Sequence, residues 1–162
     1  MNLLRPIALL AISLVAVPAN ASPQSGKVAN YAVRYDGGDR FHVDGRFTVP
    51  AKKLSLFFFP TERSPQGQAD YIKSLRAWDS AGRAQPLKYL GEGAWEGTTG
   101  PIGRVEYDVL AHHDQDRWGP GKDEVATHFD DTYFFAGNAF FLADYSWPEG
   151  PVGAKFDLPR GW

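Results

Sequence analysis

Alternation of apolar and polar side chains at every second position is the feature that most constrains this chain. It first appears in two runs, Tyr31 to Tyr35 and Phe41 to Val49, which flank the pair Gly37-Gly38. A period of two places successive side chains on opposite faces of a β-strand. Because glycine tolerates the backbone angles of a tight turn, the two runs together predict a β-hairpin.

Further short apolar segments continue along the chain, separated by turn-forming residues. They are Leu54 to Phe59, Tyr71 to Trp78, Pro86 to Tyr89, Val105 to Val109 and Val152 to Leu158. Asp79 and Gly82 bracket a turn between two of these segments. No long stretch after the N-terminal segment keeps a helical period. The pattern therefore predicts an all-β fold, an antiparallel β-sandwich of roughly seven to nine strands.

The N-terminal segment has the pattern of an export signal. Ile7 to Val17 is apolar apart from Ser13, and Ala19-Asn20-Ala21 is a small-x-small cleavage pattern. We expect residues 1–21 to be a signal peptide and residues 22–162 to be one β-sandwich domain, located in the periplasm or secreted. The apolar core is shorter than the roughly 20 residues that a membrane-spanning helix needs, so no membrane span is predicted.

Charge and cysteine content narrow the partner classes. The chain has 17 basic and 19 acidic residues, a net charge of -2, and no Lys/Arg run. This composition disfavours binding to nucleic acid or to an anionic membrane surface. There is no cysteine, so no disulfide can form and stability must come from packing.

The order of several motifs resembles a known family. They are "YAVRYD", "IKSLRAWDSAGRAQPLKYLGEGAWEG", "VEYDVLAHH", "DDTYFFAGNAFFL" and "PVGAKFDLPRGW". Together they are similar to the N-terminal domain of the M61 peptidases, the glycyl aminopeptidase family. The resemblance implies a β-sandwich that precedes a zinc-dependent catalytic domain. It differs after the third strand, where Pro60 and Tyr71 match but the family's Trp and Pro-Gly pair are missing.

A zinc peptidase of this kind needs His-Glu-x-x-His, which places two imidazoles on one helix face and a Glu beside the metal-bound water. None of the four histidines stands in such a motif. We therefore expect no catalytic residue, no metal ligand and no cofactor here. The resemblance implies an accessory or peptide-positioning module whose partner is a peptidase domain or another protein.

The stretch from Thr127 to Leu142 allows two interpretations. His128, Asp130 and Asp131, with Asp114 and Asp116, could bind calcium or a transition metal, which would make the protein a small metalloenzyme. However, neighbouring residues of a strand point to opposite faces, and Asp residues at a loop-to-strand junction commonly accept backbone N–H bonds. We favour a hairpin that turns at Gly137-Asn138.

Aromatic residues suggest an alternative function, an autonomous exported module that binds glycans or proteins. The residues of the expected binding surface are Trp118, Trp147, Tyr133, Asp130 and Asp131. Both tryptophans stand beside Gly and Pro, in loop-like contexts. Four phenylalanines, in contrast, carry apolar area that favours the core, and they are Phe134, Phe135, Phe140 and Phe141. Because strand alternation turns only half of them inward, the other half need cover from a neighbouring domain or partner.

Overall fold

A computed structural model describes residues 26–60, 64–111, 126–129 and 132–161. The expected signal peptide, residues 1–21, lies outside these ranges. Within them, no helix is both long and apolar enough to span a membrane. The described residues form eleven strands, one short 3-10 helix and one turn of α-helix.

The elements are β1 (Ala29–Gly37), β2 (Arg40–Ala51), β3 (Lys53–Ser55), η1 (Gly67–Tyr71), β4 (Ile72–Trp78), β5 (Ala84–Gln85), β6 (Leu87–Gly91), β7 (Ala94–Gly97), β8 (Ile102–Leu110), β9 (Thr127–Phe129), β10 (Thr132–Phe134), α1 (Gly137–Phe140) and β11 (Val152–Asp157). The predicted hairpin of β1 and β2 and the turn between β4 and β5 are confirmed. In that turn the N–H of Gly82 donates to the carbonyl of Asp79 over 3.0 Å.

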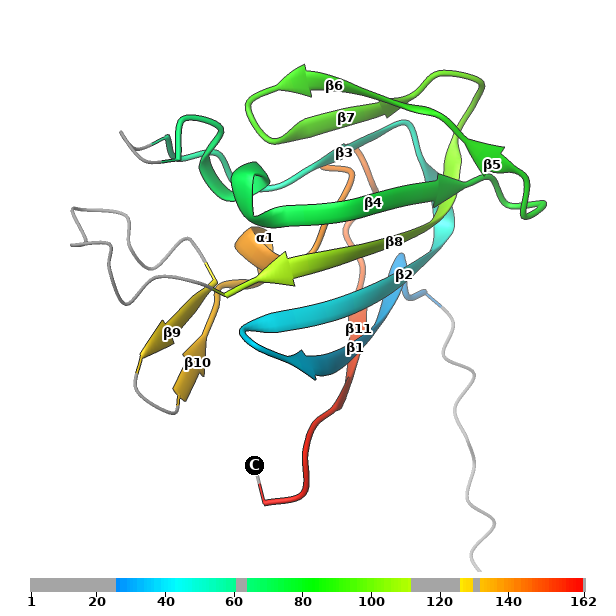
Figure 1. Cartoon of the computed structure of the whole chain (residues 1–162). Helices are drawn as coiled ribbons and strands as arrows, with labels where there is room; N and C mark the ends of the chain where they lie inside the picture. The colour runs from blue at the N-terminus through cyan, green and yellow to red at the C-terminus, as the bar shows by residue number, and fades with distance from the viewer. Residues whose placement is uncertain (1–25, 61–63, 112–125, 130–131, 162) are drawn as a thin grey trace, which may run out of the picture.

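The main layer is a six-stranded sheet in the order β11-β1-β2-β8-β4-β5 (Figure 1). The expected all-β class is confirmed. The described residues form eleven strands where roughly seven to nine were expected, and one pair in the six-stranded sheet is parallel, so that sheet is mixed. The first and last strands of the described chain, β1 and β11, pair in parallel, with Ala29 opposite Val152 and Val33 opposite Phe156.

The inner face of the main sheet is covered by a three-stranded sheet, β3-β7-β6, and by the segment around α1 (Figure 1). Between these layers lies the core, whose largest fully buried side chains include Tyr107, Phe41, Phe140, Leu54, Ile102 and Leu142. Close packing also explains Gly45 of β2, because a Cβ there would lie 2.9 Å from the Tyr31 ring.

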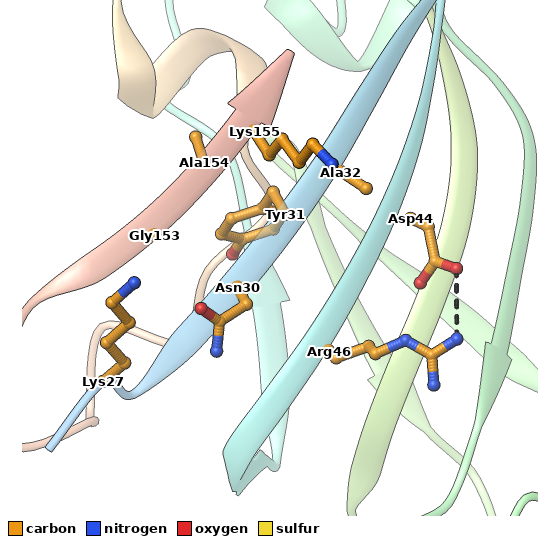
Figure 2. A pocket seen from close by; sticks show the side chains of 9 residues that line it. All are labelled: Lys27, Asn30, Tyr31, Ala32, Asp44, Arg46, Gly153, Ala154 and Lys155. Carbon is orange, nitrogen blue, oxygen red and sulfur yellow. Dashed lines mark hydrogen bonds and ion pairs between the residues drawn. The ribbon is translucent and has the colours of Figure 1, made fainter. Parts of the chain in front are cut away.

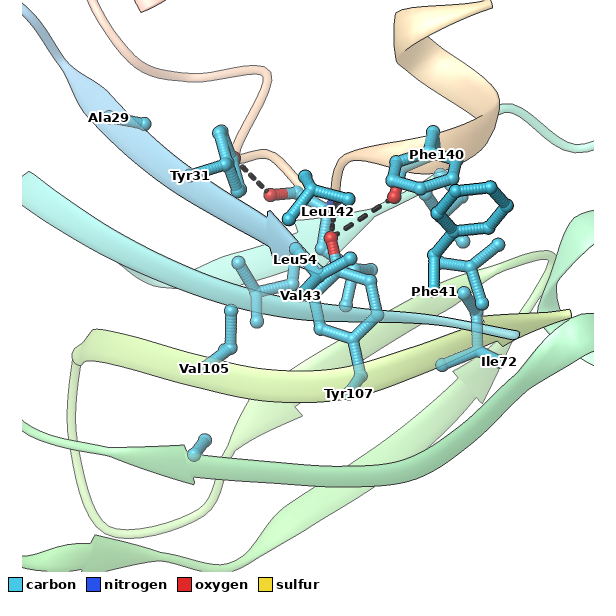
Figure 3. Packing of buried hydrophobic residues seen from close by; sticks show 14 of the residues in the cluster. Ala29, Tyr31, Phe41, Val43, Leu54, Ile72, Val105, Tyr107, Phe140 and Leu142 are labelled. Carbon is cyan, nitrogen blue, oxygen red and sulfur yellow. Dashed lines mark hydrogen bonds between the residues drawn. The ribbon is translucent and has the colours of Figure 1, made fainter. Parts of the chain in front are cut away.

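Two buried tyrosine hydroxyls fix the segment that follows α1 onto the inner face (Figure 3). The hydroxyl of Tyr107 donates to the carbonyl of Phe140 and accepts from the N–H of Leu142, each over 3.1 Å. The hydroxyl of Tyr31 donates to the carbonyl of Leu142 over 2.6 Å. Burial raises the pKa of both phenols, so both stay protonated donors.

The expected hairpin turn at Gly137-Asn138 is wrong. Gly137 to Phe140 form α1, and the hairpin in this region pairs β9 with β10, opposing His128 to Tyr133. The carbonyl of Asn138 accepts a backbone bond from Phe57 over 2.8 Å. The helical turn thus brings Phe140 fully into the core, where it stacks on Phe135 at a centroid distance of 4.1 Å. Long-range packing overrides the local turn preference of Gly-Asn.

The strand expected from Leu54 to Phe59 is shorter, because only Lys53–Ser55 pair as β3. Beyond Ser55 the backbone N–H of Leu56 donates to Gly93 and that of Phe57 to Asn138. The apolar run therefore stays beside the turn before β7 at Leu56 and contacts α1 at Phe57.

Candidate functional site

An aromatic cavity of about 710 Å³ lies between the β9–β10 hairpin, the start of β2 and the end of β11. It is lined by Phe41, His128, Thr132, Tyr133, Phe135, Phe156, Leu158 and Gly161. Its volume and mainly apolar walls are typical of sites that hold a small ligand or a side chain. We call this space the aromatic cavity.

Ring packing builds the wall between the cavity and the core. Phe41, buried at the start of β2, contacts Tyr133 edge to face at a centroid distance of 5.1 Å. Phe135 stacks on Phe156 of β11 at 5.9 Å. Phe156 and Leu158 remain 39% and 41% exposed, which is unusual for apolar side chains that line a common space. The cavity is thus a continuation of the core that no described layer covers.

The polar rim of the cavity is a network around Asp39. Tyr133 donates from its hydroxyl to Oδ1 of Asp39 over 2.8 Å, and Nδ1 of His128 is 3.1 Å from the same oxygen. The hydroxyls of Tyr133 and Tyr35 share a hydrogen bond over 3.1 Å. The His128 ring also stacks on Tyr133 at a centroid distance of 4.6 Å. These contacts fasten the β9–β10 hairpin to the turn between β1 and β2.

The backbone of that turn explains how Asp39 reaches the hairpin. Asp39 adopts a φ of 63° directly after Gly37 and Gly38, and its carbonyl accepts from the N–H of Ala111 over 2.8 Å. Burial, assisted by the hydrogen bonds to Tyr35 and Asp39, raises the pKa of Tyr133. Tyr133 therefore keeps its proton and acts as a hydrogen-bond donor rather than as a base.

The expected binding residues fall into different places. Tyr133 lines the aromatic cavity. Trp147 is half-buried and packs on Phe47 at a centroid distance of 4.9 Å. Trp118, Asp130 and Asp131 lie outside the described residues, as do Asp114 and Asp116, so the binding surface built on them stays a prediction. Of the described parts of the chain, none gathers three His, Cys, Asp or Glu side chains that could hold a metal ion.

The four phenylalanines near the hairpin differ in burial, and strand alternation predicted this difference only in part. Phe140 is fully buried, Phe135 and Phe141 are half-buried against the core, and Phe134 is 54% exposed. The sequence reasoning missed Asp39, Phe41, Phe156 and Leu158 as neighbours of Tyr133. The alternation of apolar residues from Val152 to Leu158 was the available signal. It places Phe156 on the apolar face of a strand, and such a face usually packs against other apolar side chains.

No protein-family model and no curated protein sequence matches this chain. Its fold is similar to part of the crystal structure of an aminopeptidase N family protein from Idiomarina loihiensis, with a TM-score of 0.56 and 20% sequence identity. The likeness covers 82% of this chain and 22% of that chain. This chain therefore spans about a fifth of the length of the aminopeptidase family protein, and at this identity the likeness establishes the fold alone.

Proposed function

We propose that this chain is an exported, non-catalytic β domain of the M61 N-terminal type, which serves an aminopeptidase unit by holding a peptide segment. The aromatic cavity carries the proposal: it presents Phe135, Phe156 and Leu158 to an apolar side chain, with Tyr133 and His128 at the rim. An apolar pocket with a few convergent polar groups is the usual form of a binding site. The fold likeness to part of an aminopeptidase family protein supports the same assignment.

In this proposal the chain contributes binding rather than chemistry. Asp39 is occupied as an acceptor for Tyr133 and faces His128, so its geometry is that of a group that positions a hairpin. The peptidase unit would supply the zinc-bound water and the general base. The periplasm or the extracellular medium would be the compartment in which the two act together.

Peptide binding by the purified protein tests the proposal. A fluorescein-labelled heptapeptide of alternating Leu and Ser should bind saturably, and one of Gly and Ser should bind about tenfold more weakly, because only leucine fills the cavity. Phe156→Ala should weaken binding of the Leu peptide. Tyr145→Ala removes a ring that is 66% exposed and lies outside the cavity lining, so it is the matched control.

Two results would contradict this function. Equal binding of the Leu and Gly peptides would show that the cavity does not hold apolar side chains. Hydrolysis of aminoacyl 4-nitroanilides by the purified protein, abolished by His128→Ala, would show that the chain is itself an enzyme.

A further inference from the structure

Strand β11 forms one edge of the main sheet. Among the described residues it pairs with β1 on one side and with no strand on the other. Every second residue of such a strand directs its backbone N–H and C=O groups away from the neighbour, so the edge can accept another strand. Pro151 and Pro159 border the strand and lack an N–H, which limits the free ladder to the residues between them.

The register divides the side chains of β11 between the two faces of the sheet. On β1, the residues Ala29, Tyr31 and Val33 are buried on the inner face. Their partners on β11 are Val152, Ala154 and Phe156, which therefore lie on the same face. Gly153, Lys155 and Asp157 therefore belong to the outer face. Phe156 leads on the inner side into the aromatic cavity.

On the outer face β11 borders a second hollow, of about 420 Å³ (Figure 2). Gly153 of β11 leaves space that the side chains of Asn30 and Lys27 occupy, since a Cβ there would lie 2.7 Å from Asn30 Oδ1 and 2.9 Å from Lys27 Nζ. Three basic residues, Lys27, Arg46 and Lys155, line the hollow. We call this space the basic hollow. In Figure 2 the side chains of Lys27 and Lys155 extend over the strands from two different sides of the hollow.

The charges of the basic hollow are not balanced within the described structure. Neither Lys27 nor Lys155 forms an ion pair with any described residue. Asp44 lines the hollow, but Arg104 binds both its oxygens, at 3.1 and 2.8 Å, while Arg46 reaches it only at 3.4 Å. Among the residues that line the basic hollow, three cations thus stand against one carboxylate that Arg104 already binds, and an acidic group is the complementary ligand.

A third hollow of about 550 Å³ adjoins the basic hollow toward the end of β11. Its charges are mixed, because three carboxylates line it beside three basic side chains, which are Asp44, Glu106 and Asp157 with Arg34, His42 and Lys155. Because Lys155 lines both hollows, the excess of positive charge ends at Lys155 and does not extend toward the end of β11. All three spaces include residues of β11, so one strand borders an apolar site on its inner face and a basic site on its outer face.

We propose that the open edge of β11 binds an extended peptide segment as an additional strand, with apolar side chains directed to the aromatic cavity and acidic side chains directed to the basic hollow. The segment is thus recognised by its alternation of apolar and acidic residues. This inference rests on the proposed function, because it specifies which peptides the domain holds and how. Backbone pairing provides affinity, and the two hollows provide specificity.

Other occupants of the edge fit the charge less well. Residues 1–25 of this chain are rich in apolar residues but contain no Asp or Glu, so they offer nothing to Lys155. A purely protective role is the competing explanation, since lysine and flanking prolines are common on sheet edges that must not pair. That role predicts no peptide binding at all, and it is therefore distinguishable.

Fluorescence anisotropy with designed heptapeptides tests the proposal. A peptide of alternating Leu and Glu should bind more tightly than one of alternating Leu and Lys. Lys155→Glu should weaken binding of the Leu-Glu peptide by about fivefold to tenfold and reverse the preference, because cross-strand charges attract or repel directly. Lys88→Glu is the matched control, since Lys88 is an exposed lysine on β6, in the other sheet.

Backbone methylation provides a second measurement that does not depend on charge. Two versions of the Leu-Glu peptide carry N-methyl groups either on all Leu or on all Glu amides. If the peptide adds as a strand, one version loses binding and the other keeps it, because alternate amides point toward and away from β11. A pocket that held only side chains would not distinguish the two versions in this way.

The outcomes separate the two proposals. Binding that depends on Phe156 but ignores both Lys155→Glu and methylation would overturn strand addition and leave the proposed function intact. Absence of binding by every peptide would overturn both. A concentration-dependent dimer in light scattering that Lys155→Glu dissociates, without peptide binding, would assign the edge to a second copy and overturn the proposal as well.

Discussion

The middle of the main sheet and its β11 edge follow the same alternation but have different surroundings. On β2, the inner-face residues Phe41 and Val43 are 2% and 0% exposed. On β11, the inner-face residues Val152 and Phe156 are 52% and 39% exposed. The α1 segment and the small sheet cover the first group but not the second. Alternation therefore determines which face of a strand is apolar, whereas the second layer determines whether that face serves stability or recognition.

The largest expected effect is a difference in stability between the two regions. Phe140→Ala should lower the free energy of unfolding by about 3–5 kcal/mol, because it empties a fully buried position between the layers. Phe156→Ala, its counterpart on the edge, should cost less than about 1 kcal/mol, since water already reaches that ring. Urea denaturation followed by circular dichroism measures both. Similar losses would mean that the edge belongs to the core and would remove the distinction.

A smaller effect is expected where a buried carboxylate fixes the loop after α1 to the start of β3. Asp144 accepts from the N–H groups of Lys52 and Lys53 over 2.7 and 3.3 Å, and from the N–H and hydroxyl of Ser146 over 2.9 and 2.6 Å. Asp144→Ala should cost about 2–3 kcal/mol, because it leaves these donors unpaired. Asp157→Ala on β11 should cost less than about 0.5 kcal/mol.

The Asp144 contribution should also depend on pH. Burial disfavours the charged carboxylate, but the hydrogen bonds from Ser146, Lys52 and Lys53 outweigh it and lower the pKa of Asp144. A lowered pKa in the folded state adds stability above the ordinary aspartate pKa of about 4 and loses it as the pH falls further. The difference between the native chain and Asp144→Asn should therefore be full at pH 7 and shrink below pH 4. A difference that grows on acidification would contradict this sign.

The smallest expected effect concerns a single hydroxyl. Tyr107→Phe should cost about 1–2 kcal/mol, because the carbonyl of Phe140 and the N–H of Leu142 lose a buried partner. Tyr145→Phe, which changes an exposed ring, should leave the free energy of unfolding unchanged within error. Equal effects of the two changes would show that the hydroxyl of Tyr107 does not hold the α1 segment.

The sequence predicted the fold where local chemistry decides it. Period-two runs identified β1 and β2, and the Asp79 to Gly82 turn was read correctly because its side-chain and backbone bonds are local. The parallel partner of β1 was not predictable, since β11 follows more than a hundred residues later and either edge of a hairpin can accept a strand. The hairpin turn predicted at Gly137-Asn138 was wrong for a related reason. These residues form a helical turn whose Asn138 carbonyl binds the N–H of Phe57, about eighty residues earlier in the chain.

The candidate site was predictable only in part. Tyr133 was expected at a binding surface, but its neighbours Asp39 and Phe41 precede it by more than ninety residues in the chain. No spacing rule connects such residues, because the hairpin register and the β1–β2 turn bring them together only in the folded state. The aromatic cavity is therefore a property of the topology, while its apolar character was visible in the sequence.

Hydrogen–deuterium exchange of the free and peptide-bound protein tests the central claim, that β11 is an open edge built for recognition. In the free protein the amides of Val152–Asp157 that point away from β1 should exchange much faster than those of β2 and β8. With the Leu-Glu peptide, β11 should gain protection while β2 and β8 stay unchanged. Slow exchange of β11 in the free protein, or protection confined to the β9–β10 hairpin after peptide addition, would contradict it.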